Sequence, residues 1–259
     1  MQQVRAKKFL GQHFLTDLSI AQRIADTITL ANIPVLEIGP GMGVLTQYLL
    51  KNPNIKLTAI ELDRESVAYL REWYPELNLI EGDFLKVDLN TIFPSGPFCL
   101  IGNYPYNISS QIFFKVLAYK DRIPMCSGML QKEVAQRLAA KPGNKAYGIL
   151  SVLLQAYYDI EYLFTVGNHV FNPPPKVESA VIRLTRNDRQ QLGCDEQLFK
   201  TIVKTAFNQR RKQMRNSLQQ LVGKGHPILQ ENIFTKRPEQ LHVDEFIELT
   251  NRIAQATAK

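Results

Sequence analysis

The sequence has few cysteines, and none of them stands in the spacing of a metal or disulfide motif. Its 259 residues contain three, Cys99, Cys126 and Cys194, with no Cys-x-x-Cys pair. Small extracellular domains need paired cysteines for disulfides, and structural zinc sites need closely spaced ones. The sequence therefore excludes a disulfide framework and a cysteine-based zinc site, and we expect reduced thiols and no bound metal.

Long hydrophobic runs are also missing. No apolar segment reaches the roughly 20 residues that a transmembrane helix requires. The first eight residues, with cations at Arg5, Lys7 and Lys8, lack the apolar core of a signal peptide. The chain contains no internal repeat and no low-complexity tract. These absences predict a globular, cytoplasmic protein with no membrane partner.

The composition that is present describes a folded, basic protein. Hydrophobic residues make up 45% of the chain, enough for one large domain and a smaller one. The net charge is +7, and Lys and Arg drive association with nucleic acids by neutralising phosphates. Many soluble proteins are mildly basic, so the charge alone leaves the partner open.

Short apolar runs alternate with amphipathic segments over most of the chain. We expect strands at 34–38, 56–61, 77–81, 98–101, 125–130 and 180–184, with helices at 18–28, 64–73, 109–118 and 131–140. This alternation predicts a mostly parallel α/β sheet. Two further apolar runs, 149–157 and 162–166, are expected to be late strands that complete the sheet.

A glycine loop follows the first expected strand. It reads Glu37-Ile38-Gly39-Pro40-Gly41-Met42-Gly43 and leads into a helix. Such a loop brings backbone N–H groups and a helix N-terminus close to a polar ligand. A dinucleotide fingerprint would need its third glycine at position 44, which is Val44, so the spacing argues against a pyrophosphate. It resembles the first motif of S-adenosylmethionine (AdoMet) methyltransferases.

Polar residues end the next three expected strands. Glu61 comes about twenty residues after the glycine loop, where a carboxylate can accept both ribose hydroxyls. Asp83 can accept a hydrogen bond from an adenine amino group, with Phe84 near the ring. Asn103 ends the fourth strand. Ligands of open α/β sheets bind outside the carboxyl ends of the strands, so we expect these side chains to share one site.

The stretch Asn103-Tyr104-Pro105-Tyr106 has the Asn-x-Pro-Tyr pattern of amine methyltransferases. The N6 lone pair of adenine is delocalised into the ring until its hydrogens are held out of the plane. Asn103 Oδ1 and the Pro105 carbonyl can each accept one of those hydrogens, and Tyr106 can stack on the base, so that methyl transfer is a direct in-line displacement. A sulfonium leaving group needs no metal. Strand ends also carry Asn and Pro simply to turn, so this stretch alone leaves both interpretations open.

A proline-rich loop supplies the last candidate contact with the base. Three consecutive prolines, 173–175, follow Phe171 and stiffen the loop. We expect Phe171 to stack on the base face opposite Tyr106. The alternative is that Phe171 fills the core and the prolines only shape a crossover.

The C-terminal part has a different character. A polar linker at 187–193 precedes expected helices at 196–207, from 208 onward and at 243–254. We therefore predict a catalytic domain at 1–186, with an N-terminal lid at 1–17, and a smaller all-α domain at 187–259. The helix expected from 208 begins with a basic run that is either a solvated face or an RNA contact.

Five motifs together resemble one protein family. They are Phe9-Leu10-Gly11-Gln12-His13-Phe14-Leu15, Glu37-Ile38-Gly39-Pro40-Gly41-x-Gly43, Asn103-x-Pro105-Tyr106, Phe171-x-Pro173-x-Pro175-Lys176-Val177-x-Ser179 and Asn208-x-Arg210-Arg211-Lys212. Over nearly the whole chain they resemble the small-subunit ribosomal RNA adenine dimethyltransferases, the KsgA family. That family usually has Leu where this chain has Tyr104, a difference that concerns the shape of the pocket and not its polar groups.

The resemblance implies a Rossmann-like, AdoMet-dependent monomer that dimethylates N6 of two adjacent adenosines in the 3′-terminal hairpin loop of 16S rRNA during small-subunit biogenesis. Its implied cofactor contacts are His13, Leu15, Gly39, Gly41, Glu61, Leu62, Asp83, Phe84 and Asn103. From the distribution of cations we expect RNA contacts at Lys7, Lys8, Lys176, Arg210, Arg211, Lys212 and Arg215. Two alternatives are a 23S rRNA methyltransferase of the erythromycin-resistance type and a non-catalytic ribosome-assembly factor on the same scaffold.

Overall fold

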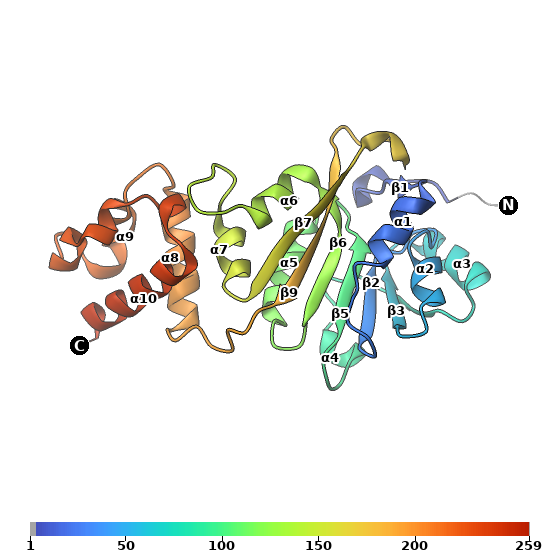
Figure 1. Ribbon diagram of the computed structural model, residues 1–259, viewed down its shortest axis with the longest axis horizontal. Coiled ribbons are helices and arrows are strands. Elements are labelled where there is room, and N and C mark those ends of the chain that lie inside the picture. Colours follow the sequence, from blue (N-terminus) through green and yellow to red (C-terminus); the bar gives the residue numbers. More distant parts are fainter. Residues whose placement is uncertain (1–3, 259) are drawn as a thin grey trace. The chain divides into compact units, whose positions relative to one another are not determined.

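The computed structural model describes residues 4–258, which form two compact units (Figure 1). The first unit takes the chain up to Ala135 together with Ile160–Arg186, and the second takes Gln136–Asp159 together with the chain from Asn187. The division at 186 and 187 coincides with the expected linker, whereas the excursion at 136–159 was not expected. The expected lid and C-terminal domain include residues 1–3 and 259, which lie outside the described residues.

A seven-stranded sheet carries the first unit. Its strands follow one another in the order β4-β3-β2-β5-β6-β9-β7 (Figure 1). Strands β2 to β6 run parallel, and β9 pairs antiparallel with β6. The bounds are β2 Pro34–Ile38, β3 Lys56–Glu61, β4 Asn78–Glu81, β5 Cys99–Asn103, β6 Met125–Gln131, β7 Tyr158–Val166 and β9 Ser179–Arg186. The mostly parallel α/β class is confirmed.

Helices cover both faces of this sheet because each buried strand presents apolar side chains to both sides. One core cluster joins α1 (Leu18–Ala25), α2 (Thr46–Lys51) and α3 (Arg64–Trp73) to alternate residues of the strands. On the other face, Phe113 of α5 (Ser109–Ala118) packs edge-on against the ring of Tyr104. The remaining helices of this part of the chain are α4 Leu89–Ile92 and α6 Lys132–Ala139.

The strand order reverses between β2 and β5. From β2 the chain adds β3 and then β4 on one side, whereas β5 and β6 lie on the other side. A crevice opens outside the carboxyl ends of the strands at such a switch point, because the two connections leave in opposite directions. The glycine loop after β2 and the Asn103 motif after β5 therefore border the same crevice.

A small second sheet ties the N-terminal segment to the proline-rich loop. Strand β1 (Phe14–Leu15) pairs antiparallel with β8 (Phe171–Asn172), and Leu15 lies opposite Phe171. The His13 ring nitrogen Nδ1 lies 2.8 Å from the Pro173 carbonyl oxygen. Two short 3-10 helices flank these strands, η1 Lys8–Leu10 and η2 Asn168–Val170.

The strand expected at 149–157 is wrong. The chain forms helix α7 (Ile149–Gln155) there, and β7 begins only at Tyr158. The Gly148 N–H donates to the Ser151 hydroxyl at 2.9 Å, which satisfies one of the donors at the helix start. Residues 149–154 are nearly all apolar, and an unbroken apolar run does not distinguish a buried strand from a buried helix.

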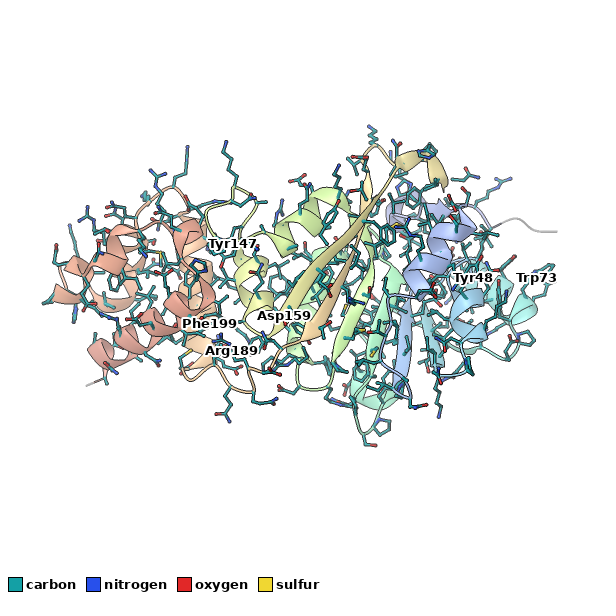
Figure 2. All side chains as sticks on the ribbon, viewed as in Figure 1. Tyr48, Trp73, Tyr147, Asp159, Arg189 and Phe199 are labelled. Atoms are coloured by element: carbon teal, nitrogen blue, oxygen red, sulfur yellow. The ribbon has the colours of Figure 1, made fainter. Side chains whose placement is uncertain are left out.

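The second unit contains helices packed around an aromatic core. Phe199 and Tyr147 are both fully buried inside it (Figure 2). The Phe207 ring lies 6.1 Å from those of Tyr147 and Phe246. The remaining helices are α8 Glu196–Asn208, α9 Met214–Val222, α10 Val243–Thr257, η3 Pro227–Gln230, η4 Asn232–Thr235 and η5 Pro238–Gln240. No helix within residues 4–258 has both the length and the hydrophobicity to cross a membrane.

The sequence predicted that the basic run begins a helix, and this prediction is wrong. Helix α8 extends to Asn208, and α9 starts only at Met214, so Arg210, Arg211 and Lys212 lie in the turn between them. The start of α9 is set by a tertiary contact, because the Met214 N–H donates to the Lys236 carbonyl at 2.8 Å. We call residues 209–213 the basic turn.

Candidate active site

One pocket lies at the carboxyl ends of the parallel strands. It extends from the glycine loop after β2 past the ends of β3 and β4 to the segment after β5. All nine expected cofactor contacts and three of the four expected catalytic residues line it: His13, Leu15, Gly39, Gly41, Glu61, Leu62, Asp83, Phe84, Asn103, Pro105 and Tyr106.

The glycine loop forms the floor of this pocket. Gly41 has a φ of +58°, a left-handed conformation that favours glycine. A side-chain carbon there would also stand 3.1 Å from the ring of Phe14. The Gly41 N–H donates to Glu61 Oε2 at 3.0 Å, which joins the loop to the end of β3.

Glu61 is a buried carboxylate with two backbone donors. It is 5% exposed, and besides Gly41 it accepts from the Asp63 N–H at 2.9 Å. Burial raises its pKa, and the backbone donors partly oppose that rise. Each carboxylate oxygen has a further lone pair, so Glu61 retains acceptor capacity for two hydroxyl groups.

The segment after β4 presents Asp83 and Phe84. The Leu85 N–H donates to Asp83 Oδ1 at 2.9 Å, which fixes the carboxylate in a local turn. Lys115, on α5, donates to the carbonyls of Phe84 and Val87 and lies 4.9 Å over the Phe84 ring. Burial lowers the pKa of Lys115, although nearby carboxylates oppose this.

The Lys115 contact was not predicted. A lysine on an amphipathic helix is normally solvated, and its sequence position carries no sign of partners in a distant loop.

The Asn103 side chain has a defined orientation. Its Nδ2 donates to the His13 carbonyl at 3.3 Å, so the oxygen Oδ1 occupies the other side of the amide. The Pro105 carbonyl accepts from the Ile108 N–H at 3.2 Å and retains a second lone pair. The ring of Tyr106 lies 5.3 Å from that of His13, and its hydroxyl bonds to the Ser179 hydroxyl. Two acceptors and two rings therefore surround this end of the pocket.

Tyr104, the departure from the family pattern, has its polar end directed into the protein. It is 1% exposed, and its hydroxyl donates to the Ser127 carbonyl at 2.7 Å and lies 3.3 Å from Cys126 Sγ. Burial raises its pKa well above the ordinary value. Side-chain carbons at Gly102 or Gly128 would stand 3.1 and 2.7 Å from its ring, so these glycines provide the room it needs.

Phe171 does not line the pocket, contrary to the expectation that it stacks on the base. It is 4% exposed and belongs to the core cluster with Leu15 and Ile24. It pairs with Leu15 across β1 and β8, and both residues belong to that cluster. The alternative interpretation, a core residue in a loop shaped by prolines, describes this structure.

The expected RNA-binding cations have different environments. Lys7 forms ion pairs with Asp63 and Glu65, which hold the N-terminal segment to the start of α3. Lys8 and Lys176 are exposed. In the second unit, Arg211, Lys212 and Arg215 are exposed, whereas Arg210 is half-buried and donates to the Asn144 carbonyl at 3.2 Å.

Glu37 is a buried acid that the sequence did not identify as distinctive. It is fully enclosed and accepts a 2.7 Å hydrogen bond from the Thr46 hydroxyl. Burial raises its pKa to about 8, so at neutral pH this carboxyl is mostly protonated. Within residues 4–258 no group of three His, Cys, Asp or Glu side chains could hold a metal ion.

Comparison with known proteins identifies the family. The sequence profile described as ribosomal RNA adenine dimethylase matches residues 3–257. The chain belongs to the ribosomal RNA adenine dimethylase family. As a member of this family, the chain is a methyltransferase. The resemblance that its motifs indicated is confirmed.

Two bacterial relatives of this dimethylase share most of its sequence. A ribosomal RNA small subunit methyltransferase A of Parabacteroides distasonis is 67% identical over 253 residues, covering 96% of this chain and 94% of that protein. One of the same name from Bacteroides thetaiotaomicron is 63% identical over 259 residues, covering 99% and 97%.

Solved structures share the dimethylase fold. A dimethyladenosine transferase from Plasmodium falciparum has a TM-score of 0.79 at 24% identity, covering 94% of this chain and 98% of that one. At that identity the likeness shows the fold alone. The 23S rRNA methyltransferase ErmE has a TM-score of 0.67 at 27% identity, covering 92% and 99%.

Proposed function

We propose that this protein transfers methyl groups from AdoMet to N6 of two adjacent adenosines in the 3′-terminal hairpin loop of small-subunit rRNA. The family membership and the names of the relatives support this substrate. The structural observation that carries it is the convergence of Gly41, Glu61, Asp83 and Asn103 on one pocket at the switch point of the sheet. Its place of action is then the cytoplasm, where bacterial ribosomes are assembled.

The residues of the pocket fit AdoMet from one end to the other. The backbone of Gly39 and Gly41 leaves space beside the loop that a side chain would fill, which suits the methionine part. Glu61 would hold the ribose hydroxyls, Asp83 would accept from the adenine amino group, and Phe84 would lie against the ring. When bound, the cofactor supplies a methyl group on a positively charged sulfur, a leaving group that needs no further activation.

Asn103 and Pro105 prepare the target amine. Asn103 Oδ1 and the Pro105 carbonyl each accept one N6 hydrogen, which holds the two hydrogens out of the base plane and directs the nitrogen lone pair toward the methyl group. The base leaves its stack to reach the pocket, and Tyr106 supports one of its faces. The hydrogen bond from Asn103 Nδ2 to the His13 carbonyl keeps the correct amide atom facing the base.

The second transfer begins from an amine with one hydrogen and one methyl group. Only one of the two acceptors is then needed, and the other must tolerate the methyl. Losing the hydrogen bond to N6 costs less at the Pro105 carbonyl, because this oxygen still accepts from the Ile108 N–H.

Cations of both units are proposed to contact rRNA phosphates. In the first unit Lys8 and Lys176 are exposed, and in the second Arg211, Lys212 and Arg215 are exposed around the basic turn. Lys7 is a weaker candidate because Asp63 and Glu65 already neutralise it.

A methylation assay tests the function. Purified protein and AdoMet are incubated separately with unmethylated small subunits and with large subunits, and the rRNA is analysed by mass spectrometry. We expect two adjacent dimethyladenosines in small-subunit RNA and none in the large subunit. Methylation of large-subunit RNA would favour the 23S type of enzyme. Absence of AdoMet binding in calorimetry would favour a non-catalytic assembly factor.

A further inference from the structure

Phe9 is the most exposed large hydrophobic side chain among the described residues. It is 76% exposed, whereas the next, Leu18 and Trp73, are each 51% exposed. A single exposed hydrophobic residue is ordinary. Phe9 is distinguished by its position, between the exposed cation Lys8 and residues 10–12, which line the pocket.

Four hydrogen bonds hold the turn around Phe9 in place, one of them to the Phe9 carbonyl itself. Within η1, the Leu10 N–H donates to the Lys7 carbonyl at 3.0 Å and the Gly11 N–H to the Lys8 carbonyl at 3.0 Å. The Lys7 N–H donates to the Gln12 side chain at 2.8 Å. The Phe9 carbonyl accepts from Asn107 Nδ2 at 3.3 Å. The ring therefore projects from an ordered turn and not from a loose chain end.

The turn forms part of the rim of the active-site pocket. The three residues that follow Phe9, Leu10 to Gln12, line that pocket, as does Asn107. A side-chain carbon at Gly11 would stand 2.8 Å from Asn107 Oδ1, so η1 sits directly on the segment that carries the Asn103 motif. Phe9 thus lies at the mouth through which a target base enters.

The charged residues near Phe9 indicate which kind of partner its ring contacts. The exposed cations closest to it in the sequence are Lys8 and Arg5. The proline-rich loop, which pairs with the N-terminal segment, adds the exposed Lys176. An apolar protein partner would be poorly matched to isolated cations, because their desolvation is costly. A single-stranded nucleic acid provides both a flat base for the ring and a phosphate for the lysine.

We propose that Phe9 is a stacking subsite for an unpaired nucleobase next to the target adenosine in the substrate RNA. This rests on the proposed function, because it needs an RNA whose target base enters the same pocket. Lys8 contacts the adjoining phosphate. The ordered turn lowers the entropic cost of stacking, since the ring is already presented.

Affinity measurements with matched variants test the subsite. Phe9→Ala and Phe9→Leu both remove the aromatic face, and Phe9→Trp keeps it. Phe114→Ala is the control, because Phe114 is also an exposed phenylalanine but neither it nor its chain neighbours line the pocket. Stacking on one base corresponds to roughly a tenfold change in affinity. We expect Phe9→Ala and Phe9→Leu to raise KM for unmethylated small subunits about tenfold, with kcat and cofactor affinity unchanged.

The salt dependence separates stacking from charge. Phe9→Ala should weaken RNA binding equally at all salt concentrations, since no phosphate contact is lost. Lys8→Gln should reduce the slope of log affinity against log salt by about one contact. If Phe9→Ala changed the slope of log affinity against log salt, its weaker binding would result from displaced lysines. That outcome would overturn the stacking subsite.

Fluorescence reports stacking directly. The chain has one tryptophan, Trp73, on α3 (Figure 2). In a Trp73→Phe background, Phe9→Trp provides a single indole at the rim, and stacking on a base should quench its emission when subunits bind. No quenching, or equal KM values for Phe9→Ala, Phe114→Ala and wild type, would overturn the proposal. Failure of the wild type to bind RNA would instead count against the proposed function.

Discussion

Two parts of the first unit were expected to contact the same adenine, and only one of them lines the pocket. Asn103 and Pro105, at the end of β5, line the pocket, whereas Phe171, in the proline-rich loop, packs in the core. The end of β5 is placed by strand order, because parallel strands deliver their carboxyl ends to one edge. Phe171 is placed by its partner Leu15, which is remote in sequence. Strand ends therefore predict a site better than loops do.

The largest effect is expected at the strand end. Asn103→Ala removes the oriented acceptor for the N6 hydrogen and should lower kcat by about a thousandfold. Binding of S-adenosylhomocysteine in calorimetry and RNA affinity should change little. Asn168→Ala is a matched control, since Asn168 donates to the Pro175 carbonyl in the loop. Near-normal turnover of Asn103→Ala would remove the strand end from its catalytic role.

Substitution at Phe171 tests whether this residue of the proline-rich loop serves the core and not the base-binding site. Phe171→Ala should cost about 4 kcal/mol of unfolding free energy, because it opens a cavity in the core. Phe171→Leu fills most of that space and should keep kcat near wild type. Urea unfolding and single-turnover kinetics measure the two properties. A large loss of kcat in a stable Phe171→Leu protein would restore the ring to the base-binding site.

Glu37, near the end of strand β2, should make the unfolding free energy depend on pH. Its folded pKa is about 8 against 4.5 when unfolded, so between these values only the folded state holds the proton. Stability from this group is therefore lost as pH rises from 4.5 to 8, by a total of about 5 kcal/mol. Glu37→Gln cannot titrate and should flatten the decline in urea unfolding measured across that range. Parallel pH curves for the two proteins would contradict the buried, protonated state.

Lys115 shows that a helix can also position a strand-end segment. Lys115→Met removes the donor to the Phe84 and Val87 carbonyls and should weaken S-adenosylhomocysteine binding about tenfold, or ~1.4 kcal/mol. Lys56→Met is the control, because Lys56 is an exposed lysine at the amino end of β3, away from the pocket at the carboxyl ends of the strands. Equal affinities of both variants in calorimetry would leave Lys115 without a part in cofactor binding.

The smallest effect is expected at Tyr104. Tyr104→Phe removes the hydroxyl that donates to the Ser127 carbonyl and should cost about 1 kcal/mol of stability. Turnover should remain unchanged, because that hydroxyl faces away from the pocket. Thermal unfolding and steady-state kinetics check this. A fall in kcat without loss of stability would show that Tyr104 shapes the pocket chemically.

Most of the fold and much of the site followed from local patterns. Strands β3 and β6 and helices α3 and α5 were expected within a residue of their bounds, because their apolar period and their end signals are contained in the segment itself. The same holds for Gly41, Glu61 and Asn103. Their positions at successive strand ends are enough to bring them together once the sheet is parallel.

The tertiary structure decided what depended on distant partners. Residues 149–155 are helical although their apolar run fits a strand equally well. The basic turn exists because Met214 is fixed by the Lys236 carbonyl, and Phe171 is buried because β8 pairs with β1. Lys115 gained its role from carbonyls in another segment. The sequence by itself determined the parallel sheet and the residues at its strand ends, since short-range periodicity and connection order are sufficient for both. Only the tertiary structure decided which loop and helix side chains reach the pocket, because long-range pairing sets their direction.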